Sequence, residues 1–142
     1  MSESVGRVNS MSFFSTFGGN NVAGAAGMAV LDVIRDENLL ENSRSVGSYL
    51  RRGISSLMAR HAMIGDVRGV GLATGVELVL DRTTRAPAPL QTKRLLGLLR
   101  DEGVLIGGEG KFANVLKIRP PLVFGRAHAD LAVAAIDRAL AR

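Results

Sequence analysis

The sequence predicts an α+β fold, with a small, mainly antiparallel sheet and helices packed on one face. Two observations support it. Apolar residues recur at helical spacing in four segments, while three shorter segments have the composition or the period-two alternation of strands, in the order helix, helix, strand, helix, strand, strand, helix. A chain of 142 residues that is 46% hydrophobic is also long enough to bury a core of its own as one domain.

The first helix is predicted over about residues 21–38, after a polar, irregular lead-in at residues 1–12. Residues 15–21 read Ser-Thr-Phe-Gly-Gly-Asn-Asn, so Asn20 or Asn21 can cap the helix. Two interpretations of this stretch stay open. It is a phosphate-binding corner, with the hydroxyls of Ser15 and Thr16 beside a helix N-terminus, or it is a glycine-rich turn with an ordinary cap. The small residues of the helix leave one thin face, which favours close approach of another element.

The second helix is predicted over 39–61, with Gly47 and Gly53 weakening it and an apolar stripe at Val46, Leu50, Ile54, Leu57 and Met58. One strand is predicted over 67–80, because apolar residues fall at period two there. A third helix follows at 90–102, where Gly103 provides a natural stop.

The C-terminal part is predicted as two short strands and a helix. Residues 104–106 form the first strand, the Gly-Gly-Glu-Gly run at 107–110 is a flexible loop, and residues 114–119 form the second strand before two prolines. The last helix is predicted over 127–141, with an inward face made by Leu131, Ala135, Ile136 and Leu140. Gly125 lacks the Ser or Asp cap that such a helix prefers, so its start is expected to fray.

Composition narrows the function. There are no cysteines, which excludes disulfides and thiolate metal sites, and His61 and His128 have no ligand-spaced partner, so both are expected to be structural and no metal is expected. The net charge of +5 suits an acidic partner, but single scattered arginines and 4% aromatic residues argue against nucleic acid. No apolar run is long enough to span a membrane, and the N-terminus has no export pattern, so a cytoplasmic location is expected.

Several motifs together resemble the class III aminotransferases, which use pyridoxal 5′-phosphate. The resemblance covers residues 13–142 and is carried by four runs in the family's order, at 15–20, 64–72, 103–106 and 114–122 (the last reads Asn-Val-Leu-Lys-Ile-Arg-Pro-Pro-Leu). The chain is similar to the C-terminal small domain of these fold type I enzymes only, with the catalytic large domain absent.

The resemblance implies a dimer in which Ser15 and Thr16 reach the cofactor phosphate held by the other subunit. The lysine that forms a Schiff base with the cofactor lies upstream of residue 15 in the family, whereas the lysines here are Lys93, Lys111 and Lys117. No catalytic residue is therefore expected in this chain, which we interpret as a fragment, a split half or a remnant that is inactive alone. A non-catalytic module that docks on a full-length paralogue is the alternative.

The resemblance also places substrate contacts at Lys117 and Arg119. Amino-acid transaminases of the family usually have an arginine at the first position, where its planar fork binds a substrate carboxylate, and lysine cannot copy that geometry. Members that act as phospho-lyases on phosphorylated amino alcohols show a similar Val-Leu-Lys pattern. Two activities are thus left open: amino transfer between an amino acid or amine and a keto acid, and phospho-lyase chemistry. Equally, both residues fit plain surface charges on a strand.

Overall fold

The computed structural model describes residues 14–142, so the predicted lead-in at 1–12 lies outside the described residues. Its helices are α2 (Asn21–Asp36), α3 (Leu39–Ser56), the short 3-10 helix η1 (Leu57–Ala59), α4 (Pro89–Asp101) and α5 (Arg126–Leu140). Its strands are β1 (Ile64–Val70), β2 (Ala73–Asp81), β3 (Ala86–Pro87), β4 (Gly107–Glu109) and β5 (Val115–Ile118).

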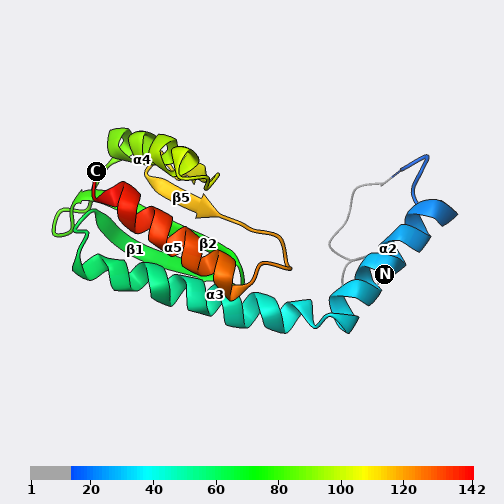
Figure 1. Cartoon of the computed structure of the whole chain (residues 1–142). Helices are drawn as coiled ribbons and strands as arrows, with labels where there is room; N and C mark the ends of the chain where they lie inside the picture. The colour runs from blue at the N-terminus through cyan, green and yellow to red at the C-terminus, as the bar shows by residue number, and fades with distance from the viewer. Residues whose placement is uncertain (1–13) are drawn as a thin grey trace.

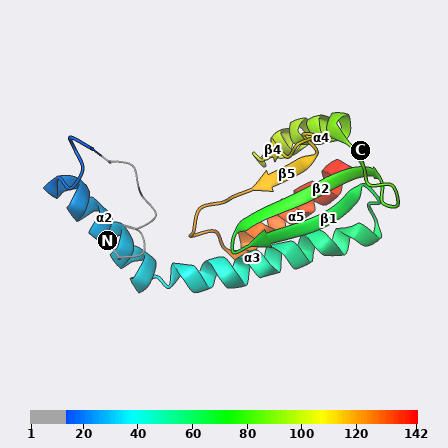
Figure 2. The same ribbon diagram turned by 180° about the vertical axis from the view of Figure 1, so that it is seen from behind.

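The strands form one antiparallel sheet in the order β1-β2-β5-β4, with β3 paired to the end of β2. Helix α5 lies across one face of this sheet and α3 runs along its β1 side (Figure 1), while the opposite face is open to the viewer in Figure 2. The expected α+β architecture, with helices on one face of an antiparallel sheet, is confirmed. The C-terminus lies at the end of the sheet-and-helix body that is away from α2 (Figure 1).

The core lies between the sheet and its helices. Along β2, Thr74, Val76 and Leu78 are buried, whereas the alternating Gly75 and Glu77 are only partly buried and belong to the open face. The stripe predicted on the second helix is confirmed, with four of its five members buried: Val46, Leu50, Ile54 and Leu57. Over residues 74–78, this alternation leaves the other face of the sheet free to build a site.

The single strand predicted over 67–80 is wrong, because the segment is a hairpin of β1 and β2 that turns at Gly71 and Leu72. Gly71 has a φ of 53°, which glycine adopts without strain. A β-carbon on Gly69 would lie 2.1 Å from the carbonyl oxygen of Ala73, so the two strands approach closely there. The period-two pattern continued across the turn because Leu72 itself is buried at 5% exposure.

The next strand is also displaced from its predicted position. Residues 104–106 have no strand, and Leu105 is 90% exposed, whereas β4 occupies Gly107–Glu109 inside the predicted flexible loop. Gly107 and Gly108 pair with Lys117 and Leu116 of β5. Backbone pairing, which needs no apolar side chain, decides the strand here, and a sequence pattern built on side chains misses it.

Helix α5 departs from prediction at two points. Its start does not lack a partner, because the Gly125 N–H donates to Nδ1 of His128 at 3.2 Å. Leu131, predicted to face inward, is 65% exposed, while Ile136 and several alanines make the buried face: Ala129, Ala132, Ala135 and Ala139. Small residues form this face because α5 packs against α3, where a β-carbon on Gly53 would lie 2.9 Å from Val133.

Helix α2 projects away from the body and contacts α3 (Figures 1 and 2). None of its residues is buried, and its large apolar side chains are exposed, including Val22, Met28, Val30, Leu31 and Val33. The thin, small-residue face predicted for it meets no described element, since nothing lies within 4 Å of a β-carbon placed on Gly24 or Gly27. The predicted second helix, extended to 61, instead ends at Ser56 and passes into η1.

Candidate functional site

The loop that carries Ser15 and Thr16 is folded back on itself at the start of α2. The Gly18 N–H donates to the Ser15 carbonyl at 3.3 Å, and the Asn20 side-chain amide donates to the Phe17 carbonyl at 2.7 Å. Asn20 is the N-cap, since its Oδ1 accepts from the Ala23 N–H at 2.9 Å. The prediction of a cap at Asn20 or Asn21 is thus confirmed at Asn20.

This loop exposes two hydroxyl groups, those of Ser15 and Thr16, close to the start of α2. A β-carbon on Gly18 would lie 3.2 Å from Oγ of Ser15, so the missing side chain makes room for that hydroxyl. Asn20 caps one N–H of the first turn, and the exposed hydroxyls of Ser15 and Thr16 are further donors beside it. The residues present therefore fit the phosphate of a cofactor.

A second candidate surface lies on the open face of the sheet. Arg68 of β1 pairs with Gly75 of β2, Gly75 pairs with Lys117 of β5, and Lys117 pairs with Gly107 of β4. One row across the sheet thus sets two cationic side chains around a glycine on the central strand. Because Gly75 has no side chain, a hollow remains there, and Arg119 lines it as well.

The three cationic residues of this face differ in their ionic contacts. Arg68 Nη1 donates to Asp66 and Glu77 at 2.7 Å each, and the hydrogen bond to Asp66, followed by that to Glu77, raises the pKa of Arg68. Lys117 forms an ion pair with Glu109 of β4. Within residues 14–142 no acidic group pairs with Arg119, so this residue keeps its charge available beside Lys117.

The structure brings Lys117 and Arg119 together, as the sequence predicts, but keeps both apart from Ser15 and Thr16. The loop before α2 lies at the far end of that helix from the sheet (Figures 1 and 2). Sixteen helical residues span about 24 Å, so one chain does not join the two groups in one site.

Sequence reasoning missed Glu109 and Arg68 as members of the open face. Glu109 lay in a segment predicted as loop, and the predicted single strand concealed the hairpin that turns Arg68 toward Gly75. The available signal was the opposite charge of Arg68 and Glu77, which lie diagonally across the hairpin and form an ion pair.

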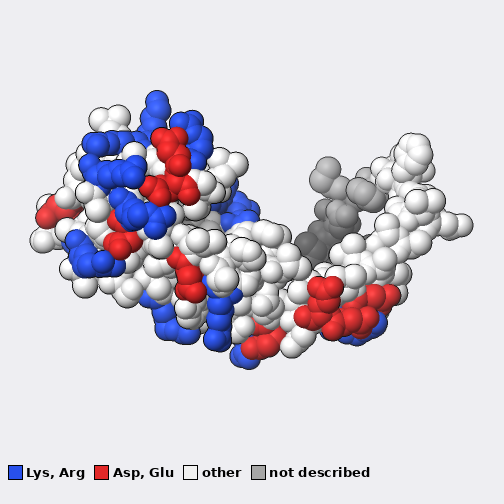
Figure 3. All heavy atoms as spheres, viewed as in Figure 1, with Lys and Arg blue, Asp and Glu red and all other residues white. Residues whose placement is uncertain are grey.

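The charged surface shows no separate basic stripe on the face in view. Figure 3 shows Lys and Arg interspersed with Asp and Glu over the sheet-and-helix body, and α2 mostly without charge apart from acidic and basic groups near its end. The expectation that nucleic acid is no partner stays a prediction. None of the described helices is long and apolar enough to cross a membrane.

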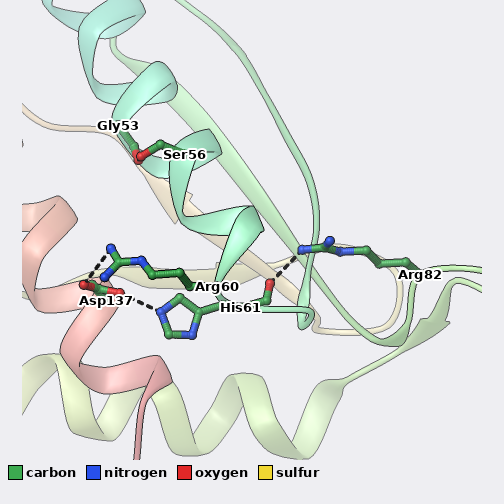
Figure 4. A network of polar contacts seen from close by, with 6 residues as sticks. All are labelled: Gly53, Ser56, Arg60, His61, Arg82 and Asp137. Carbon is green, nitrogen blue, oxygen red and sulfur yellow. Dashed lines mark hydrogen bonds and ion pairs between the residues drawn. The ribbon is translucent and has the colours of Figure 1, made fainter.

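His61 has a structural partner, in line with its expected role. Its Nε2 lies 2.6 Å from Oδ1 of Asp137 on α5, and Arg60 reaches the same carboxylate at 2.9 Å (Figure 4). Arg82 donates to the carbonyl of His61 at 2.7 Å, so the end of η1 is tied to both α5 and the segment after β2. Among residues 14–142, no cluster of three His, Cys, Asp or Glu side chains is arranged to hold a metal ion.

Comparison with known proteins identifies the family of this chain. The family model for aminotransferase class-III matches residues 2–140. The chain is 46% identical over 140 residues to the mitochondrial alanine–glyoxylate aminotransferase 2 homolog 2 of Arabidopsis thaliana, a match covering 99% of this chain and 29% of that protein.

Solved structures agree with the sequence match. A phospholyase from Arthrobacter in complex with phosphoethanolamine is 43% identical, with a TM-score of 0.86 over 97% of this chain and 32% of that one. A pyridoxal-phosphate-bound amine transaminase from an uncultivated Pseudomonas species is 36% identical, with a TM-score of 0.83 over 94% of this chain and 30% of that one.

The chain thus spans less than a third of the length of these relatives. Their shared fold is that of fold type I transaminases, and the cofactor that the comparisons indicate is pyridoxal phosphate. Because the family model matches residues 2–140, nearly the whole of this chain, the chain belongs to the class III aminotransferase family.

Proposed function

We propose that residues 13–142 are the C-terminal domain of a pyridoxal-phosphate-dependent transaminase, which transfers an amino group between an amino acid or amine and a keto acid. The observation that carries the proposal is the separation of two binding groups by the length of α2, the hydroxyls of Ser15 and Thr16 at one end and the Lys117–Arg119 face at the other. Groups this far apart serve two active sites, which favours a dimer.

Each group has a distinct task in this proposal. Ser15 and Thr16 donate hydrogen bonds to the cofactor phosphate of the neighbouring subunit and hold its position. Lys117 and Arg119 attract and orient the anionic end of the substrate over the glycine floor at Gly75. When bound, pyridoxal phosphate supplies the electron sink that the reaction at the amino-bearing carbon requires.

The exposed apolar side chains of α2 support a partner subunit. Val22, Met28 and Leu31 of this helix are exposed to solvent. Burying them against a partner stabilises the complex by roughly 25 cal/mol for each Å² of apolar surface. We propose that a second class III subunit, either another copy or a full-length enzyme, provides that cover. A cytoplasmic location stays a prediction, and the Arabidopsis relative carries a mitochondrial description.

Phospho-lyase activity is the second candidate, and Lys117 favours it. Lysine binds a phosphate as a compact point charge but lacks the planar fork with which arginine holds a substrate carboxylate through two hydrogen bonds. The Arthrobacter relative, described in complex with phosphoethanolamine, supports this candidate at 43% identity.

A chimaera separates the two activities. These 142 residues would replace the matching C-terminal part of a class III relative whose large domain carries the catalytic lysine. Formation of alanine from pyruvate with an amine donor supports the transaminase, and release of inorganic phosphate from phosphoethanolamine supports the phospho-lyase. If the folded, cofactor-loaded chimaera does neither, or if changing Ser15 and Thr16 to alanine leaves its affinity for pyridoxal phosphate unchanged, the proposal is wrong.

A further inference from the structure

Glu109 is the acidic partner of Lys117, and the sheet register puts it there. Lys117 lies opposite Gly107 of β4, and Glu109 follows two residues later on the same side of that strand, opposite Val115. The two charged ends meet as an ion pair at the edge of the hollow that Gly75 leaves open. The position of Glu109 is thus a consequence of β4, the strand that the sequence did not predict.

Charge balance on the open face depends on this one side chain. Arg68 already pairs with two carboxylates, those of Asp66 and Glu77, through its Nη1. Among the described residues, Glu109 is then the acidic group that pairs with Lys117, and none pairs with the neighbouring Arg119. Moving Glu109 away leaves two adjacent positive charges without a described counter-ion, which is an anion site.

Breaking the ion pair between Lys117 and Glu109 costs little free energy. The side chains of Lys117 and Glu109 are 32% and 54% exposed, and exposed pairs contribute about 0.2–1 kcal/mol. Glu109 also stands between Gly108 and Gly110 on a three-residue edge strand whose residues are all exposed. Gly110 has a φ of 91°, so the backbone beside Glu109 already uses conformations that glycine alone reaches easily.

We propose that Glu109 is a displaceable counter-ion, which holds Lys117 in place in the free protein and yields it to the anionic group of the substrate. The inference rests on the proposed function, because it takes Lys117 as the substrate contact. An arriving phosphate monoester carries about 1.5–2 negative charges at neutral pH, more than the single charge of the carboxylate it replaces. When the anion leaves, Glu109 pairs with Lys117 again and lowers the affinity for the departing group.

The experiment measures anion binding to the 142-residue chain, with inorganic phosphate as the probe. Phosphate is titrated at constant ionic strength into the ¹⁵N-labelled wild-type protein and three variants: Glu109→Gln, Lys117→Gln and Glu41→Gln. Amide signals of β4 and β5 report binding, and the signal of the Lys117 ammonium reports its partner. Glu41→Gln is the matched control, since it removes an exposed glutamate from an ion pair with Arg44 away from the sheet.

The inference expects Glu109→Gln to bind phosphate about two- to fivefold more tightly than wild type, which is the fold-change that corresponds to a pair of up to about 1 kcal/mol. Glu41→Gln is expected to bind like wild type, and Lys117→Gln at least fivefold more weakly. In the wild type, phosphate is expected to shift the Lys117 ammonium signal toward its position in Glu109→Gln.

The other outcomes separate the two claims. If Lys117→Gln weakens binding but Glu109→Gln equals the wild type or binds less tightly, Lys117 contacts the anion and the counter-ion role of Glu109 is wrong. If Lys117→Gln binds like wild type, the substrate role of Lys117 fails as well. Absence of phosphate binding in both wild type and Glu109→Gln overturns the inference, since freeing Lys117 then creates no anion site.

Discussion

Gly47 of α3 packs directly against Gly71 of the β1–β2 turn, so closely that a β-carbon on residue 47 would lie 1.8 Å from the Gly71 carbonyl oxygen. The same carbonyl accepts a hydrogen bond from Arg51 at 2.5 Å, and the Ser43 hydroxyl accepts the Leu72 N–H at 3.2 Å. This contact fixes the hairpin, and with it the open face that carries Lys117, against the first helix of the body.

Gly47→Ala is expected to destabilise the fold, although alanine is the better helix former. The methyl group forces α3 away from the hairpin, and overpacking of this kind costs about 1–3 kcal/mol, more than the helix gains. Denaturant unfolding measures the change. The control is Gly97→Ala in α4, where nothing lies within 4 Å of the new β-carbon and a gain of about 0.5–1 kcal/mol is expected. Equal effects at both positions would contradict the packing argument.

Thr74→Val is expected to stabilise the protein. Thr74 is 3% exposed, and within the described part of the chain its Oγ1 has no hydrogen-bond partner. Valine has the same shape without the unsatisfied hydroxyl, whose burial costs about 1–3 kcal/mol. Thr92→Val is the matched control, because the Thr92 hydroxyl donates to the Ala88 carbonyl at 2.8 Å and its loss is expected to destabilise by about 1 kcal/mol. A loss of stability in Thr74→Val would show that a partner satisfies this hydroxyl in solution.

The Asp137 carboxylate is expected to make stability fall in acid. The hydrogen bond from His61 is the main cause that lowers the pKa of Asp137 below its ordinary 3.8. Because this pKa is lower in the folded than in the unfolded chain, the stabilisation is present above 3.8 and is lost as the pH falls through the folded value. The difference in unfolding free energy between wild type and Asp137→Asn should therefore be larger at pH 7 than at pH 3. Asp101→Asn, an exposed aspartate beside Arg100, is the control, and a pH-independent difference for Asp137→Asn would refute the assignment.

Asn20→Ala is expected to loosen the start of α2. Loss of the bond from the Ala23 N–H to Oδ1 of Asn20 costs about 1 kcal/mol, as for other N-caps. Amide hydrogen exchange of residues 22–24 measures it, and exchange there should rise several-fold. Asn20→Ser keeps an oxygen acceptor and should restore most of the protection. If both variants exchange alike, the cap does not hold the helix in solution.

The candidate site was predictable from sequence only in part. Lys117 and Arg119 stand two residues apart in the strand predicted over 114–119, which puts them on one face, because alternation along a strand is a local property. Arg68 and Glu109 were not predicted, because their places depend on which strands are neighbours and in what register. No local feature of the sequence around Glu109 indicates that Lys117 lies on the neighbouring strand.

The sequence by itself determined the helices, the buried stripe of α3, the Asn20 cap and the family, since each rests on spacing or on motifs in order along the chain. Only the tertiary structure decided the hairpin at Gly71, the strand at Gly107–Glu109 and the separation of Ser15 from Lys117. The physical reason is that backbone pairing and close glycine contacts such as Gly47 on Gly71 leave no apolar pattern in the sequence. They become visible when the partner elements stand side by side.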